Sequence, residues 1–179
     1  MKNLIEVYKG WLVFLIFLIP QLGYSQSTPS FNDAEIASIA VTANDIDIKY
    51  GELAIIKSKN ESIKNFAQTM INDHNAVIKQ AVDLVTKLKV TPQDNDLSKQ
   101  LNKGAEETRL MLSKKKGDDF NKAYINNEVD YHQAVIDAVR DVLIPQSKNE
   151  ELKALLEAVL PALETHLEHA KMVQKEIGG

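Results

Sequence analysis

Four long segments of the chain carry apolar side chains at steps of three and four residues, the spacing that lines one face of an α-helix. They cover residues 33–58, 60–88, 118–144 and 148–176. Each helix would be roughly 40 Å long at about 1.5 Å per residue. The connections are short except for one, so helices that follow each other through a short turn must lie side by side and antiparallel. The pattern predicts an all-α antiparallel four-helix bundle.

The one long connection carries a weaker helical pattern of its own. Residues 90–95 contain Pro92 and polar side chains, which is typical of a turn. Residues 97–116 then show some helical spacing, interrupted by Gly104. We expect an extra, shorter connecting helix that packs on the outside of the bundle.

Capping side chains and prolines set the predicted helix boundaries. Side chains that can accept from free backbone N–H groups stand at Asn32 or Asp33, Asn60, Asp118, and Ser147 or Asn149. Pro145 is expected to end the third long helix. Pro161 lies inside the last one, where the missing backbone N–H predicts a kink.

The first 25 residues have the pattern of a signal peptide. Lys2 and Lys9 flank an apolar run over residues 11–19, and small residues follow it. The run is about half the ~20 residues that a spanning helix needs. We therefore expect an exported protein, periplasmic or associated with the cell envelope, with no integral membrane segment after cleavage. The predicted organisation is a signal peptide over 1–25, a linker over 26–32 and one bundle domain over 33–177.

Composition argues against several classes of function. The whole chain has 21 basic and 25 acidic residues, and loss of the leader removes two Lys and one Glu, which leaves a formal net charge of −5. Arg109 and Arg140 are the only arginines and form no basic stripe, so nucleic acid is a poor partner. The absence of cysteine excludes disulfides and thiolate metal sites. Phosphate loops, Gly-x-Ser-x-Gly and His-Glu-x-x-His are also absent.

Histidines near the helix midpoints are the main functional feature. His166 stands in the apolar stripe of the last helix, where an unpaired polar group would cost about 1–3 kcal/mol. His74 and His132 lie within about four residues of their helix midpoints, and so does Asp47 on the first helix. Four-helix bundles build metal sites from such inward residues at one height. We hypothesise that these four residues bind one transition-metal ion, zinc, copper, iron or nickel, or a small ligand.

Three further residues are candidates to support this site. Glu128 lies one turn before His132, and metal-bound histidines usually donate their other N–H to a carboxylate or carbonyl. Met70 lies one turn before His74 and offers a soft ligand for Cu(I). Tyr131 can hydrogen-bond a buried imidazole.

Two other interpretations remain open at this stage. In one, the protein is a structural or interaction protein, and its histidines form a polar layer that only specifies helix packing. In the other, it is a metal-dependent enzyme, which needs an open coordination position and a path for substrate. The sequence shows neither of these enzyme features. Asp73 and His169 lie off the inward faces, so we expect both to be exposed to solvent.

Three motifs are similar to those of a bacterial family. They are Phe-Ala-Gln-Thr-Met-Ile-Asn-Asp-His over 66–74, Ala123-Tyr124 followed by His-Gln-Ala-Val over 132–135, and Leu-Pro-Ala-Leu-Glu-Thr-His-Leu over 160–167. The set resembles domain-of-unknown-function family 4142, whose members are often labelled outer membrane proteins and are grouped with ferritin-like bundles. The resemblance covers about residues 31–175.

The resemblance implies an exported, ferritin-like four-helix domain, and it implies no reaction because the activity of the family is unknown. The family's recurring histidines correspond to His74, His132 and His166, and its first-helix acid corresponds to Asp47. Di-iron members of the ferritin-like group use Glu-x-x-His pairs, which this chain lacks. The sequence therefore favours a mononuclear, histidine-rich site over di-iron chemistry, and a binding, sequestration or stress-related role without turnover.

Overall fold

The structure, a computed structural model, describes residues 29–178, which are helical apart from short connections. The predicted signal peptide and residues 26–28 of the predicted linker lie outside the described residues. The elements are α1 (Asp33–Lys57), α2 (Glu61–Leu88), α3 (Asp96–Ser113), α4 (Gly117–Ala138), the π-helical turn η1 (Val139–Leu143), α5 (Ile144–Gln146) and α6 (Glu150–Gly178). The prediction of an all-α bundle with an extra connecting helix is confirmed.

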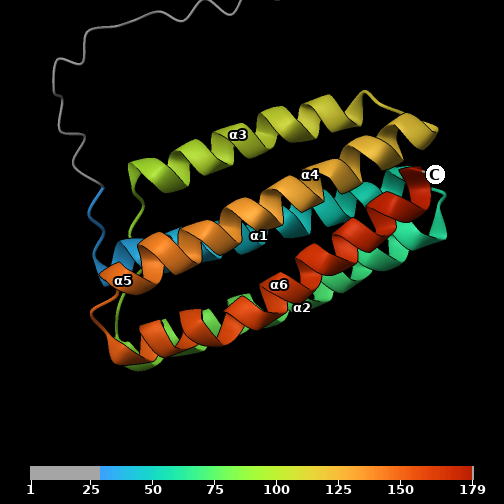
Figure 1. Ribbon diagram of the computed structural model, residues 1–179. Coiled ribbons are helices and arrows are strands. Elements are labelled where there is room, and N and C mark those ends of the chain that lie inside the picture. Colours follow the sequence, from blue (N-terminus) through green and yellow to red (C-terminus); the bar gives the residue numbers. More distant parts are fainter. Residues whose placement is uncertain (1–28, 179) are drawn as a thin grey trace, which may run out of the picture.

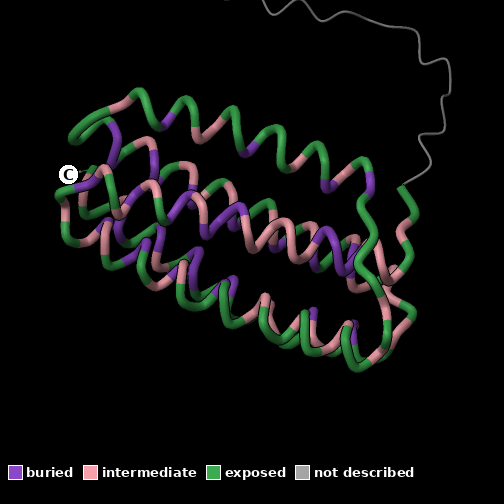
Figure 2. The backbone as a smooth tube through the Cα atoms, turned by 180° about the vertical axis from the view of Figure 1, so that it is seen from behind, coloured by how far each residue is buried: buried purple, intermediate pink, exposed green. Residues whose placement is uncertain are grey.

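The bundle is built from two closely packed helix pairs, α1 with α2 and α4 with α6. α4, η1 and α5 follow one another as a single long rod, and α3 runs along the outside (Figure 1). α3 packs mainly on α1, and its surface is largely exposed, with isolated buried residues (Figure 2). No helix within the described residues is long and apolar enough to cross a membrane.

Side-chain caps start most of the helices where the sequence predicts them. The Asn32 side chain accepts from the Glu35 backbone N–H, and the Glu35 carboxylate accepts from the Asn32 N–H in return. Asn60 accepts from the Ile63 N–H at 3.1 Å. Asn149 accepts from the N–H of Leu152 at 3.0 Å and so begins α6.

The predicted cap at Asp118 is wrong. α4 begins one residue earlier, at Gly117, and no side chain caps it. Gly117 has a φ of 52°, in the left-handed region that glycine enters without strain, and this turns the chain sharply from α3 into α4. Asp118 instead lies within the first turn, where its charge favours the positive end of the helix dipole.

Pro145 acts more mildly than expected. Pro145 does not stop the third long helix in front of it, because the chain passes through η1 and Pro145 then sits in the first turn of α5. α6 continues as helix through Pro161 to its end.

The core consists of two apolar clusters of different character. The cluster at the α1–α2 turn is rich in aromatic rings, with Tyr50, Phe66, Phe120 and Tyr124 all buried. The cluster at the α5 end is aliphatic, made of isoleucine, valine and leucine side chains. Each of the four long helices passes from one cluster to the other near its middle. The polar residues of the candidate site lie at this junction.

Candidate metal centre

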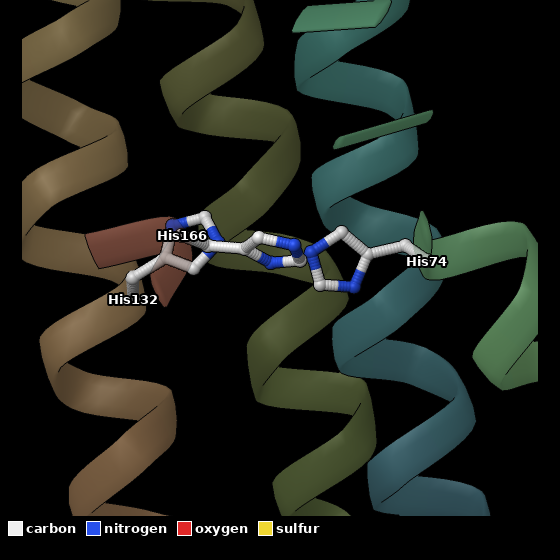
Figure 3. A group of neighbouring side chains, drawn as sticks. All are labelled: His74, His132 and His166. Atoms are coloured by element: carbon white, nitrogen blue, oxygen red, sulfur yellow. The ribbon is translucent and has the colours of Figure 1, made fainter. Parts of the chain in front are cut away.

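Each helix of the bundle contributes one polar residue to the layer between the two core clusters. α1 carries Asp47, α2 carries His74, α4 carries His132 and α6 carries His166. Their exposed fractions are 0%, 4%, 1% and 6%, so all four are removed from solvent. Figure 3 shows the three imidazole rings lying together between the helices. The ring centroids are 5.2–5.8 Å apart.

One nitrogen of each ring is held by an acceptor on the outer side of the cluster. The acceptors are Oδ1 of Asn44 for His74 Nδ1 at 2.7 Å, the backbone O of Glu128 for His132 Nδ1 at 2.9 Å, and Oδ2 of Asp73 for His166 Nε2 at 3.0 Å. A carbonyl or carboxylate oxygen only accepts, so the ring nitrogen facing it must carry the proton. The Asn44 amide is oriented by its own nitrogen, which donates to the Ala40 carbonyl at 2.8 Å.

The remaining nitrogen of each ring faces inward without a partner. His74 Nε2, His132 Nε2 and His166 Nδ1 are buried and make no hydrogen bond. One ligand atom from each ring lies within 4.8 Å of the other two. Each ring therefore keeps one buried nitrogen free of hydrogen bonds, while an oxygen fixes the N–H of the other. Metal-binding histidines have this arrangement of donor and support.

Asp47 lies against two of the three histidines. Its Oδ2 is 2.5 Å from His74 Nε2 and 3.5 Å from His132 Nε2. The shorter distance is that of an ion pair if His74 carries a second proton. A second proton on His74, or a cation between the two atoms, would make this close approach favourable. Burial by itself raises the pKa of Asp47, but His74 and His132 outweigh it and lower that pKa to about 2.

A second acid lies beside Asp47. Glu128 is fully buried, and Asp47, Glu128 and His132 form a further group whose ligand atoms lie within 4.8 Å of one another. Burial and the adjacent Asp47 charge raise the pKa of Glu128 well above its ordinary value. The protonated, uncharged form of Glu128 is therefore favoured relative to that of an exposed glutamate. Its main-chain oxygen, and not its carboxylate, accepts from His132.

Burial keeps two of the histidines neutral. It lowers the pKa of His132, with a further contribution from the other imidazoles, and Asp47 opposes this only in part. Burial also lowers the pKa of His166, against the opposing effect of its Asp73 partner. Both rings consequently offer an unprotonated nitrogen at neutral pH, which is the form that binds a metal ion.

The other predicted supporting residues take different positions. Tyr131 donates its hydroxyl to the Ala43 carbonyl at 2.8 Å and packs edge-on against Tyr50, so it braces α4 on α1 without a hydrogen bond to an imidazole. Met70 is fully buried in the aromatic-rich cluster.

Sequence reasoning missed two supporting residues. Asn44 lies one turn before Asp47 on α1, and that spacing was the available sign that it shares the inward face. Asp73 was expected to face solvent, and half of its side chain does, but its carboxylate also reaches His166 across the α2–α6 interface. His169, likewise expected to be exposed, is partly buried with its ring edge-on to Phe66 at 5.1 Å.

The sequence matches the family described as a domain of unknown function, DUF4142, over residues 21–173. The chain belongs to the DUF4142 family. The match confirms the resemblance inferred from the motifs. Its range includes Asp47, His74, His132 and His166. No curated protein matches this DUF4142 chain.

A solved structure described as "CopM in the Cu(II)-bound form" has a similar fold. The likeness has a TM-score of 0.60 at 16% sequence identity, and it covers 82% of this chain and 98% of that one. At this identity it shows that the DUF4142 domain shares the helical-bundle fold of CopM.

Proposed function

We propose that this DUF4142 protein binds one transition-metal ion through His74, His132 and His166, with Asp47 as the adjacent anionic ligand. It holds the ion and carries out no turnover. One observation carries the proposal: three buried ring nitrogens converge without partners, while the opposite N–H of each ring is fixed by an oxygen. The leader-like N-terminus supports action in the periplasm or cell envelope.

A layer that served packing alone would leave these groups unfavourably placed. Each buried polar atom without a partner costs about 1–3 kcal/mol. The layer contains three such imidazole nitrogens and both oxygens of Asp47. A cation bound between the rings would satisfy their free nitrogens and attract the Asp47 carboxylate, which lies against His74 and His132.

The donor set indicates the class of metal. Three imidazole nitrogens and one carboxylate, without thiolate, suit zinc, copper, iron and nickel. Among divalent ions the Irving–Williams order places Cu²⁺ above Zn²⁺ and Fe²⁺ for such ligands. The fold shared with a protein solved in a Cu(II)-bound form supports copper as the first ion to test. The chain lacks the Glu-x-x-His pairs of di-iron bundles, which disfavours a di-iron centre.

Elemental analysis of protein purified without a chelating tag tests this function. After incubation with copper, zinc and iron and removal of free ions, we expect about one metal ion per chain. The triple variant His74→Ala/His132→Ala/His166→Ala should lose it. His169→Ala, which removes a histidine outside the cluster, should keep it.

The proposal is wrong if the triple variant retains metal while circular dichroism shows it folded. It is also wrong if the unmodified protein binds none of the three ions. That second result would favour the structural alternative, an envelope protein whose histidines specify helix packing. A triple His→Gln variant, closer in size to histidine, provides the comparison if the alanine variant unfolds.

A further inference from the structure

An ion can reach the buried histidine layer along the core from either end of the bundle, or sideways between two helices. On one side of the layer lies the aromatic-rich cluster, whose members Phe66, Met70 and Tyr124 are wholly buried. On the other side lies an apolar cavity, which the three histidines line together with mostly aliphatic side chains. Sideways, the layer reaches the interface between α2 and α6, where Asp73 contacts His166.

Neither half of the core offers a ligand to an ion on its way to the layer. No acidic residue, lysine or arginine of the described residues lines the cavity. The buried members of the aromatic-rich cluster are likewise aromatic and aliphatic. An ion that leaves water without gaining ligands pays a large desolvation cost. Entry between the helices is therefore favoured over entry along the core.

Asp73 is the point at which the histidine layer meets solvent. Its side chain is 52% exposed, and its Oδ2 accepts from His166 Nε2 at 3.0 Å. The acceptors of the other two rings are different, because Asn44 is an uncharged, half-buried amide and Glu128 uses the backbone oxygen of a buried residue. Of the three acceptors, Asp73 alone combines a carboxylate with exposure to solvent.

The His166 ring connects this exposed carboxylate to the inside of the layer. Its other nitrogen, Nδ1, is buried and makes no hydrogen bond. The centroid of the ring lies 5.2 Å from that of His74 and 5.6 Å from that of His132. Both of those rings lie against the wholly buried carboxylate of Asp47. Donor groups therefore run from an exposed carboxylate, through the imidazoles, to a buried one.

We propose that Asp73 is the entry point for the metal ion and that its contact with His166 controls uptake. The carboxylate captures the ion from solvent. Its hydrogen bond to His166 then weakens, because the cation and the ring N–H compete for the same oxygen. The released ring turns about its side-chain bonds, binds the ion through Nδ1 and brings it between His74 and His132. This inference rests on the proposed metal function, and it describes how the ion reaches that site.

The rate of copper uptake tests the role of Asp73. Stopped-flow mixing of metal-free protein with Cu(II), followed with a fluorescent indicator of the free ion, gives the association rate constant. Asp73→Asn removes the charge and keeps an oxygen that can accept from His166. We expect its association to be at least about fivefold slower at low ionic strength, and to depend less on salt, because the attraction it lacks is screened by ions. Asp73→Glu, which keeps the charge, should retain fast uptake.

Asp130→Asn is the matched control. Asp130 is exposed and lies two residues before His132, so it stands close to the height of the layer, on α4 instead of α2. Its substitution removes the same charge from the chain and should leave the association rate unchanged. Circular dichroism and copper content, measured for every variant, show that each is folded and loaded.

The outcomes separate this inference from the metal function. If copper binds but Asp73→Asn takes it up as fast as Asp130→Asn does, the inference is overturned and the metal function stands. Unchanged association with faster dissociation also overturns it, because Asp73 would then only support the bound His166 ring. If the unmodified protein binds no ion, both proposals are overturned. Slower and less salt-dependent uptake in Asp73→Asn, restored in Asp73→Glu, supports the inference.

Discussion

At the scale of single residues, the hydrogen bonds that the imidazole N–H groups donate decide which ring nitrogen of each histidine can bind a metal ion. Asn44, the Glu128 carbonyl and Asp73 each fix a proton on one nitrogen of a ring, and this leaves the other nitrogen as a free donor. Two of these bonds join helices, Asn44 of α1 to His74 of α2 and Asp73 of α2 to His166 of α6, whereas the bond from His132 lies within α4.

Asn44→Ala should therefore weaken metal binding without removing a ligand. Loss of the acceptor frees the His74 ring to turn and to change tautomer, and such supporting contacts are worth about 10–100-fold in affinity. A competition titration against a chromogenic chelator measures this. Asn75→Ala, which removes an exposed amide bonded only to its own helix, should leave affinity unchanged. Equal affinities in the two variants would contradict the role given to Asn44.

The metal-free protein should lose stability as pH falls. His132 and His166 have a lower pKa in the fold than the ordinary value of 6.5, so below that pH the unfolded chain takes up protons first. Their contribution is complete above about pH 6.5 and declines below it. Asp47, with a pKa of about 2, adds a second loss below about pH 4. Urea denaturation at several pH values measures both, and a flat profile from about pH 7 to about pH 3 would contradict them.

The contribution of Glu128 to folding stability should fall as pH rises, opposite to that of the two histidines and Asp47. Its pKa is raised in the fold, so the folded state keeps a proton that the unfolded chain releases above about pH 4.5. Its contribution is fully present below that pH and is lost as pH rises. Glu128→Gln, which imitates the protonated acid, should gain stability relative to the unmodified protein at pH 8 more than at pH 4. Urea denaturation of both proteins at each pH measures the difference in their free energies of unfolding. A difference that does not change with pH would exclude a raised pKa for Glu128.

At the scale of elements, the start of α6 is tied to the start of α1. The Asp33 carboxylate accepts from the backbone N–H groups of Lys148 at 2.8 Å and Asn149 at 3.1 Å. This contact joins residues more than a hundred positions apart at the end of the bundle where the cavity lies. The starts of α1 and α6 are consequently held together at this end, although the α2–α6 pair diverges here from the α1–α4 pair (Figure 1).

Asp33→Ala should lower the free energy of unfolding by about 1–2 kcal/mol, the usual cost of losing a capping carboxylate. Asp83→Ala is the matched control, because its carboxylate makes an exposed pair with Lys79 at i,i+4, and such pairs contribute less than about 1 kcal/mol. Urea denaturation of both variants gives the comparison. A smaller loss for Asp33→Ala than for Asp83→Ala would show that the contact between α1 and α6 contributes little.

At the scale of the whole molecule, the polar layer separates a tightly filled aromatic half from an aliphatic half that contains a cavity. An ion in the layer would bind all four helices at once, so its binding energy would appear as stability of the complete bundle. At a free ion concentration 100-fold above Kd, this linkage stabilises the fold by about 2.7 kcal/mol.

For a domain of this size that stabilisation corresponds to an increase in Tm of roughly 5–10 °C. We expect thermal unfolding followed by circular dichroism to show the increase with copper, and to show none in the triple His→Ala variant. His169→Ala should respond like the unmodified protein. An equal shift in the triple variant would place the ion elsewhere on the molecule.

The amino-acid sequence by itself determined the four long helices, the outer connecting helix and the inward placement of His74, His132 and His166. These features follow from local spacing, because residues three and four apart share a face whatever the helix packs against. Helix midpoints also place the histidines at a common height, since antiparallel helices of equal length joined by short turns align at their centres.

Only the tertiary structure decided which nitrogen of each ring is free, that Asp73 reaches His166, and that burial beside Asp47 raises the pKa of Glu128. Each depends on an atom from another helix or on burial by several helices, and crossing angles and axial offsets are not encoded in the pattern of one segment. The cavity has the same origin. In the sequence, its alanines and valines have the pattern of an ordinary core. They enclose space only because the α2–α6 pair diverges from the α1–α4 pair at the α5 end (Figure 1).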